Sequence, residues 1–131
     1  GIVAKDIRMW QPDPDGTGIG AVVSYTFRVL RPLMAYFGKE KYAAILAVTP
    51  VDDAYSIGWM FPCVQGRADV PEADILAFQK LIIDQDVPIV ESQRPELLPL
   101  DLQTELHLRS DRTAIAYRKW LKELGVTFGV A

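Results

Sequence analysis

The sequence predicts an α+β fold in which an antiparallel β-sheet grips one long helix. Two observations lead to this prediction. In the first half of the chain, segments of alternating apolar and polar residues are separated by turn-forming residues. The second half contains a segment of helical length with apolar residues along one side. A chain of 131 residues is long enough for one domain with its own core. We therefore expect residues 1–131 to form a single domain.

Four strands are expected, over residues 3–9, 21–30, 41–49 and 54–64. The second alternates most clearly, because four apolar residues share one face: Val23, Tyr25, Phe27 and Val29. Pro32 marks its end or an edge of the sheet. The segment Pro50-Val51-Asp52-Asp53 is typical of a hairpin turn, so the last two strands should be antiparallel. On the last strand one face carries Tyr55, Ile57, Trp59 and Phe61, and an apolar face of this size needs a cover.

The second half supplies that cover. A helix is expected from Pro71 to Ser92, since proline is favoured in the first turn and acids follow it. Pro88 lies inside this helix, where it removes one backbone hydrogen bond and should bend the axis. Ser110 or Asp111 can cap a last helix over residues 112–124, which Gly125 would end.

Composition narrows the classes of function. The net charge is -3 and the basic residues are scattered, which argues against nucleic-acid binding. No apolar run approaches the length of a membrane helix. Cys63 and His107 are the only cysteine and histidine in the sequence, so neither an internal disulfide nor a Cys/His zinc site can form within it. We expect a cytoplasmic protein, with structural or surface roles for His107.

Asp86 is the position where the helical pattern breaks. At about 100° per residue, one broad face of the expected helix carries Ile75, Phe78, Ile82, Ile83, Ile89 and Val90. Lys80, Asp84 and Glu91 lie on the opposite side. Asp86 instead falls in the middle of the apolar face, with Gln79 and Gln93 beside it.

An ionised carboxylate without a partner in such a place costs several kcal/mol. Three arrangements could offset this cost: a nearby arginine, protonation with a hydrogen bond, or a bound cation. Arg94 and Arg118 are candidate partners in the first case, although Arg118 is also expected on a solvated helix face with Arg112 and Lys119. The pattern alone favours a structural partner, an arginine or a lysine, over a bound cation.

The segment from Asp84 to Pro95, DQDVPIVESQRP, resembles the part of Rieske-type non-heme iron oxygenase large subunits that carries a carboxylate iron ligand. The similarity is to the ring-hydroxylating and O-demethylating subgroup and extends over about residues 45–125. It includes Thr49-Pro50-Val51-Asp52-Asp53 and the C-terminal stretches around Glu105-Leu106-His107 and Tyr117-Arg118-Lys119-Trp120. The carboxylate that corresponds to the ligand is Asp86.

The resemblance implies a terminal oxygenase that hydroxylates or demethylates an aromatic or similar apolar substrate. Two histidines and Asp86 would hold a mononuclear Fe(II), and a Rieske [2Fe-2S] cluster would deliver electrons that come from NAD(P)H through a reductase or ferredoxin. Members are commonly homotrimers. The cluster-binding Cys and His pairs and the two-histidine segment are absent from residues 1–131. We therefore expect an incomplete catalytic domain that needs the remainder of the polypeptide.

The resemblance also suggests a substrate pocket. Phe78 and Ile82 share the helix face of Asp86 and precede it by one or two turns. Trp59 and Phe61 are expected in the core, together with Tyr55, and are further candidates for the pocket. The rival hypothesis is a metal-free helix-grip module, like the START and Bet v 1 domains that bind lipids and hormones, because fold alone cannot separate the two. A non-catalytic assembly subunit is a third alternative.

Overall fold

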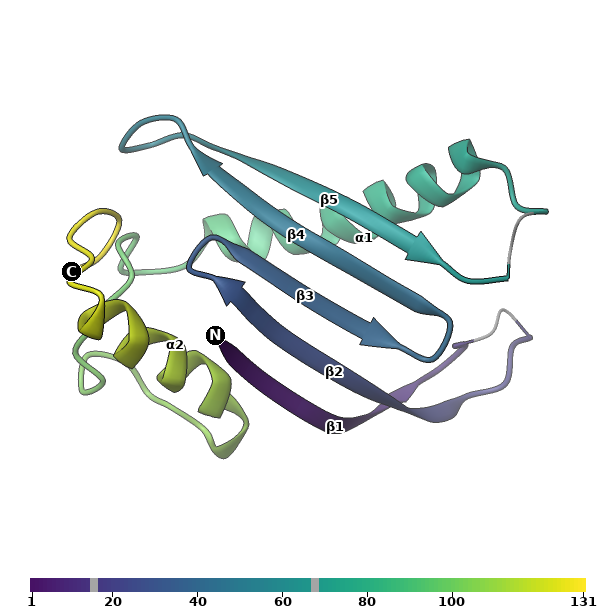
Figure 1. Ribbon diagram of the computed structural model, residues 1–131, viewed down its shortest axis with the longest axis horizontal. Coiled ribbons are helices and arrows are strands. Elements are labelled where there is room, and N and C mark those ends of the chain that lie inside the picture. Colours follow the sequence, from purple (N-terminus) through teal and green to yellow (C-terminus); the bar gives the residue numbers. More distant parts are fainter. Residues whose placement is uncertain (15–16, 67–68) are drawn as a thin grey trace. The chain divides into compact units, whose positions relative to one another are not determined.

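The computed structural model describes residues 1–14, 17–66 and 69–131. They divide into two compact units, Gly1–Gly66 and Arg67–Ala131. The first unit contains the β-sheet and the second contains the helices (Figure 1). The boundary therefore falls where the sequence predicted the change from strands to helices, and the α+β class is confirmed.

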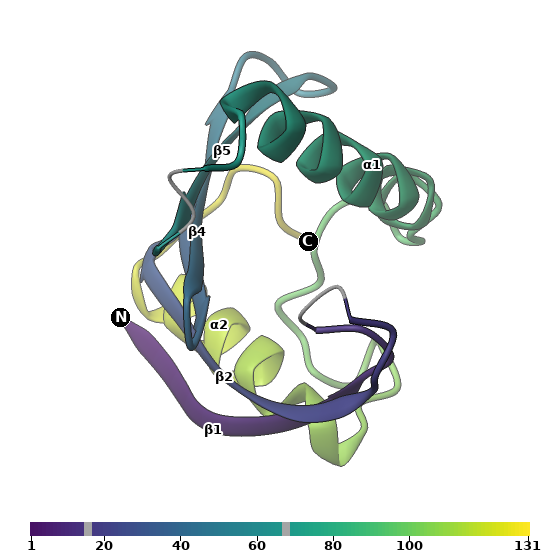
Figure 2. The same ribbon diagram turned by 90° about the vertical axis from the view of Figure 1, so that its right-hand side faces the viewer.

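The first unit is a five-stranded antiparallel sheet in which each strand pairs with the next along the chain. Its strands are β1 (Ile2–Gln11), β2 (Ala21–Arg31), β3 (Met34–Lys39), β4 (Tyr42–Pro50) and β5 (Ser56–Val64). Figure 2 shows that they form a single curved layer. The four expected strands are confirmed within about two residues at each end. The turn before β5 is closed by Asp52, whose Oδ1 accepts hydrogen bonds from the backbone N–H groups of Ala54 and Tyr55 at 2.8 Å.

The strand β3 was not predicted. Pro32 was expected to mark the end of the second strand or an edge of the sheet, and β2 does end at Arg31. Pro32 and Leu33 form a two-residue connection between Arg31 and Met34, which are paired. A proline in a connection removes no hydrogen bond from the ladder. Met34–Lys39, MAYFGK, shows no alternation of apolar and polar residues that would have marked it as a strand.

One face of the sheet carries the core of this unit. Four rings follow one another across β2, β3 and β4, and we call them the aromatic row: Tyr25, Phe27, Phe37 and Tyr42. Their centroids are 5.7 Å, 6.3 Å and 5.7 Å apart in that order. Tyr25 and Ala44 on this face are buried, at 8% and 1% exposure. The prediction that Tyr25 and Phe27 share an apolar face is confirmed.

The edge strand β1 is irregular. Its register against β2 shifts between Ala4 and Ile7. Within this bulge Asp6 adopts a positive φ of 57°, a conformation that aspartate tolerates better than most residues. The bulge interrupts the hydrogen-bond ladder near the middle of the strand.

The second unit contains α1 (Glu72–Glu91), the short 3-10 helix η1 (Arg109–Asp111) and α2 (Arg112–Glu123). The expected long helix is confirmed, with Pro71 at its start and Pro88 inside it. Beyond Pro88, the carbonyl of Ile89 accepts hydrogen bonds from Ser92 Oγ at 2.8 Å and Gln93 Nε2 at 3.1 Å. These side chains satisfy an orphan carbonyl of the last turn. Gly125 ends α2 with a positive φ of 67°, as expected.

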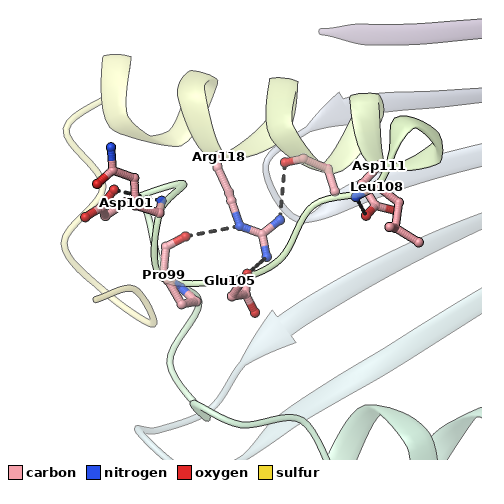
Figure 3. Close-up of polar contacts among 8 residues, drawn as sticks. Pro99, Asp101, Glu105, Leu108, Asp111 and Arg118 are labelled. Atoms are coloured by element: carbon pink, nitrogen blue, oxygen red, sulfur yellow. Dashed lines mark hydrogen bonds and ion pairs between the residues drawn. The ribbon is translucent and has the colours of Figure 1, made fainter.

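A buried arginine joins α2 to the segment before it (Figure 3). Arg118 is only 9% exposed. Its Nε donates to the carbonyl of Pro99 at 3.1 Å, and one terminal nitrogen donates to Ala114 O at 3.3 Å. The other pairs with the Glu105 carboxylate. The expected solvated position of Arg118 is therefore wrong: all three of its nitrogens donate a hydrogen bond inside the unit. Nearby, the chain end pairs with Leu98 and Leu100, and Leu100 N donates to Ala131 O at 2.8 Å.

Candidate functional site

Helix α1 has two chemically different sides. The least exposed residues of α1 are Ile75, Gln79 and Ile83. They are spaced four residues apart, so they lie along one side of the helix, which we call the Gln79 stripe. Gln79 is the most buried of them, at 8% exposure. On the opposite side Lys80 and Asp84 form an exposed ion pair one helical turn apart. The two-sided helix predicted from the sequence is therefore present.

The large apolar residues of α1 are less covered than a core helix requires. Phe78 is 58% exposed and Ile82 is 39% exposed. Ile89 and Val90 are more open still, at 64% and 68%. Isolated exposed apolar side chains are ordinary, but a contiguous set on one helix marks a surface that binds something.

Asp86 lies on the Gln79 stripe, seven residues further along the helix. Its side chain is exposed and makes no hydrogen bond or ion pair with any residue that the structure describes. Both candidate arginine partners are engaged elsewhere. Arg94 lies 3.5 Å from Glu96 and donates to the carbonyls of Glu91 and Gln93, while Arg118 pairs with Glu105. Within the described part of the chain, neither candidate arginine therefore forms an ion pair with Asp86.

Potential metal-ligand side chains do not cluster in the part of the chain that the structure describes. Among residues 1–14, 17–66 and 69–131, no three His, Cys, Asp or Glu side chains gather in a way that could hold a metal ion. His107 and Cys63 lie in different units. A free carboxylate such as that of Asp86 fits the role of one anionic iron ligand. If Asp86 is such a ligand, the two histidines that the resemblance implies would come from outside residues 1–131.

Trp59 and Phe61 lie on the face of the sheet opposite the aromatic row. Pro62 pairs with Ala44 on the row's face, so its neighbour Phe61 points the other way. The two side chains are 50% and 54% exposed, and Tyr55 is 71% exposed. The expectation that these three are core residues is wrong for this chain. Trp59 is nevertheless held in place, because its Nε1 donates to Thr49 Oγ1 at 3.1 Å.

The sequence did not predict the open depression at the end of β3, β4 and β5. It has a volume of about 440 Å³. Polar and charged residues make up much of its wall: Ser24, Thr26, Lys39, Glu40, Lys41 and Gln65. Tyr42 and Cys63 also line it, and burial, followed by the nearby Cys63, raises the pKa of the Tyr42 phenol. The wall mixes polar and apolar surface in similar amounts, and none of the residues expected in the pocket beside Asp86 lines it.

Comparison with known proteins decides the family. Residues 15–127 match the family described as the vanillate O-demethylase oxygenase C-terminal domain. The chain belongs to this family. The resemblance to the C-terminal part of a Rieske oxygenase large subunit is thereby confirmed. The matched residues include β2 to β5, α1, α2 and every candidate site residue, whereas β1 precedes them.

Three curated relatives of this oxygenase domain are demethylases by name. The chain is 31% identical over 128 residues to a probable methylxanthine N7-demethylase of Pseudomonas sp. (strain TJI-51), a match that covers 90% of the chain and 45% of the relative. It is 36% identical over 89 residues to a methylxanthine N3-demethylase of Pseudomonas putida, covering 67% of the chain and 24% of the relative. It is 30% identical over 117 residues to a methylxanthine N1-demethylase of the same species, covering 85% and 31%. The chain therefore spans less than half the length of these relatives.

No helix among the described residues of this oxygenase domain is both long and apolar enough to cross a membrane.

Proposed function

We propose that this chain is the C-terminal part of the catalytic domain of a terminal oxygenase that removes a methyl group from a small aromatic substrate. One observation carries the proposal: in a domain of the vanillate O-demethylase family, α1 presents an unpaired carboxylate, Asp86, on its partly buried stripe. A carboxylate without a protein partner is free to bind a cation. The demethylase names of the relatives support the reaction class.

Asp86 is proposed as one of three protein ligands of a mononuclear Fe(II), with two histidines from the remainder of the polypeptide. Such a site leaves positions open for dioxygen and substrate, which is the chemistry that the iron supplies when bound. Asp86 contributes a negative charge to the ligand set, which favours retention of a divalent cation. A Rieske [2Fe-2S] cluster elsewhere in the polypeptide is proposed as the electron donor.

The residues around Asp86 are proposed to bind the substrate. Phe78 and Ile82 lie one to two turns before Asp86 on the flank of the same stripe and are 58% and 39% exposed. Burying these side chains against an apolar ring is favourable at about 25 cal/mol per Å² of apolar surface. Trp59 and Phe61 on β5 remain proposed pocket residues as well, with the orientation of Trp59 fixed by Thr49.

The proposed partners follow from the family and from the length of the relatives. The chain covers 45%, 24% and 31% of these proteins, so the remainder of the polypeptide is the first partner. A homotrimer, and a reductase or ferredoxin that passes electrons from NAD(P)H, are proposed in addition. The metal-free ligand-binding alternative is not favoured, because each of these relatives is named as a demethylase.

Iron content tests the proposal. We expect the complete polypeptide to hold about three irons per chain, two in the cluster and one mononuclear. Asp86→Ala should lose only the mononuclear iron and with it the release of formaldehyde from a methylated substrate. The spectrum of the Rieske cluster should persist, which shows that the protein is folded.

Asp84→Ala is the matched control. Asp84 lies on the same helix, but it is exposed and paired with Lys80, so its removal should leave the iron content unchanged. Equal iron in wild type and Asp86→Ala, with an intact cluster in both, would show that Asp86 is not a ligand.

A further inference from the structure

Small residues form the floor of the depression at the end of β3, β4 and β5. Gly38 pairs with Thr26 on one side and with Ala43 on the other, and Ala43 pairs with Cys63. Paired residues of a sheet point to the same face, so these four form one row across β2 to β5 (Figure 1). All four line the depression. Glycine and alanine fill little space in the middle of this row, and the register of the sheet therefore creates the hollow.

Hydroxyl groups line the same hollow. Ser24 precedes Thr26 by two residues and lies on the same face of β2. A Cβ at Gly38 would lie 2.3 Å from the Tyr36 hydroxyl, so this hydroxyl occupies the space that a side chain at residue 38 would take. None of the three hydroxyl groups makes a hydrogen bond with any residue that the structure describes. Each is therefore free to donate to a bound molecule.

Basic residues that are scattered along the sequence come together beside the depression. Lys41 lines it. The Arg28 guanidinium lies 6.0 Å from the centroid of the Tyr36 ring, and Arg8 pairs with Ser24 on the neighbouring strand. Both arginines therefore lie on the face of the sheet that carries the depression. Within residues 1–14, 17–66 and 69–131, none of these three cations forms an ion pair.

The balance of charge at the depression is opposite to that of the whole chain. The sequence has a net charge of -3. Glu40 is the acidic residue among those that line the depression, and Lys39 and Lys41 are the basic ones. The Lys39 ammonium lies 5.8 Å from the centroid of the Tyr25 ring, which belongs to the aromatic row on the other face. Even without Lys39, the two arginines and Lys41 outweigh Glu40, and such a surface attracts anions.

We propose that this depression binds the phosphate group of a small phosphate monoester. Arg28 and Lys41 neutralise its negative charge, because guanidinium and ammonium groups are the usual partners of phosphate. Hydrogen bonds to its oxygens come from three hydroxyl groups, those of Ser24, Thr26 and Tyr36. A phosphate presents three strong acceptor oxygens, one more than a carboxylate, and so it matches this number of donors better.

The size of the depression agrees with this ligand. Its volume of about 440 Å³ exceeds that of a phosphate ion and leaves room for the esterified group. The site lies in the first unit, and it shares no residue with the proposed iron and substrate sites. The inference therefore goes beyond the proposed function and does not depend on it.

Three variants and two probes test the proposal in the complete, iron-loaded polypeptide. Arg28→Gln removes the charge, and Thr26→Val removes a hydroxyl group without changing the shape of the side chain. Arg31→Gln is the matched control, since it is the same change on the same strand at an exposed position outside the depression. The dissociation constants of methyl phosphate and acetate are measured by calorimetry at constant ionic strength, together with iron content and melting temperature.

Wild type should bind methyl phosphate about tenfold more tightly than acetate, since more charge-assisted hydrogen bonds form. Arg28→Gln should weaken methyl phosphate by about tenfold or more, and Thr26→Val by about threefold. Arg31→Gln should stay within about twofold of wild type. The iron content and the melting temperature should be unchanged in all three variants, which shows that the loss of binding is local.

Three results would overturn the proposal. The first is a wild type that does not bind methyl phosphate or prefers acetate. The second is equal weakening by Arg28→Gln and Arg31→Gln, which would indicate a general effect of charge. The third is unchanged affinity in both Arg28→Gln and Thr26→Val, which would place the bound phosphate elsewhere. Failure of the proposed function has a different signature, because the protein would then lack mononuclear iron whatever its affinity for methyl phosphate.

Discussion

Replacing Arg118 should destabilise the second unit more than any other single change of a charged residue on α2. The guanidinium is 9% exposed and makes three hydrogen-bonding interactions, one of them with the Glu105 carboxylate. Arg118→Met keeps much of the apolar stem but leaves the Pro99 carbonyl and Glu105 without their partner. Removing one member of a buried ion pair costs about 3–5 kcal/mol.

The lower end of this range applies here. The Glu105 side chain is 27% exposed, so water can solvate its carboxylate after the arginine is gone. We therefore expect a loss of about 3 kcal/mol in the local stability of α2. Glu105→Gln should cost less, about 1 kcal/mol, because the amide oxygen can still accept a hydrogen bond from Arg118.

Hydrogen exchange measures this local stability in the complete polypeptide. A loss of about 3 kcal/mol corresponds to about 150-fold faster exchange of the α2 amides. Lys119→Met is the control, because Lys119 is the next residue and is exposed, and a surface change of this kind stays within about 0.5 kcal/mol. Exchange of the α2 amides in Arg118→Met that matches Lys119→Met would refute the reasoning.

Two further predictions concern the sheet. Gly38→Ala should lower the free energy of unfolding by about 1–3 kcal/mol, because the new Cβ would lie 2.3 Å from the Tyr36 hydroxyl. Gly58→Ala is the control and should be neutral, since its Cβ would meet nothing within 4 Å. Equal changes in melting temperature for the two variants would contradict the steric argument. Burial, with a smaller contribution from Cys63, raises the pKa of Tyr42 in the folded protein above its ordinary value of 10.0. The contribution of Tyr42 to the free energy of unfolding is therefore fully present below pH 10.0 and is lost as the pH rises through the pKa of the folded state. Burial also raises the pKa of Tyr117, so phenolate absorbance should show late-titrating tyrosines, of which Tyr42→Phe removes one. A titration curve unchanged by that substitution would contradict the prediction.

Much of the fold could be predicted because its elements have local causes. Alternation in β2 and the helical period around Gln79 and Asp86 are set by backbone geometry, which a sequence displays directly. β3 was missed because Pro32 reads as a breaker, although a proline in a two-residue connection is compatible with the sheet. A proline is informative only once the hydrogen bonds around it are known.

Long-range pairing explains what was missed near the candidate site. Nothing local to Arg118 indicates that it would meet Glu105 and Pro99, which precede it by 13 and 19 residues. Gln79 is a second example. The helical spacing puts it on the same face as Asp86, but it does not indicate that the Gln79 amide makes no hydrogen bond with any described residue. The stripe was predictable, but the state of each polar group on it depended on contacts between distant segments.

The bulge in β1 determines how the sheet can grow. A strand at the edge of a sheet offers unpaired N–H and C=O groups to any other strand, including one from a second molecule. In β1 the register shift at Lys5 and Asp6, with the positive φ of Asp6, breaks the straight row of groups that such an addition needs. This edge of the sheet is therefore protected against aggregation, because a strand from a second molecule finds no continuous row of groups to pair with.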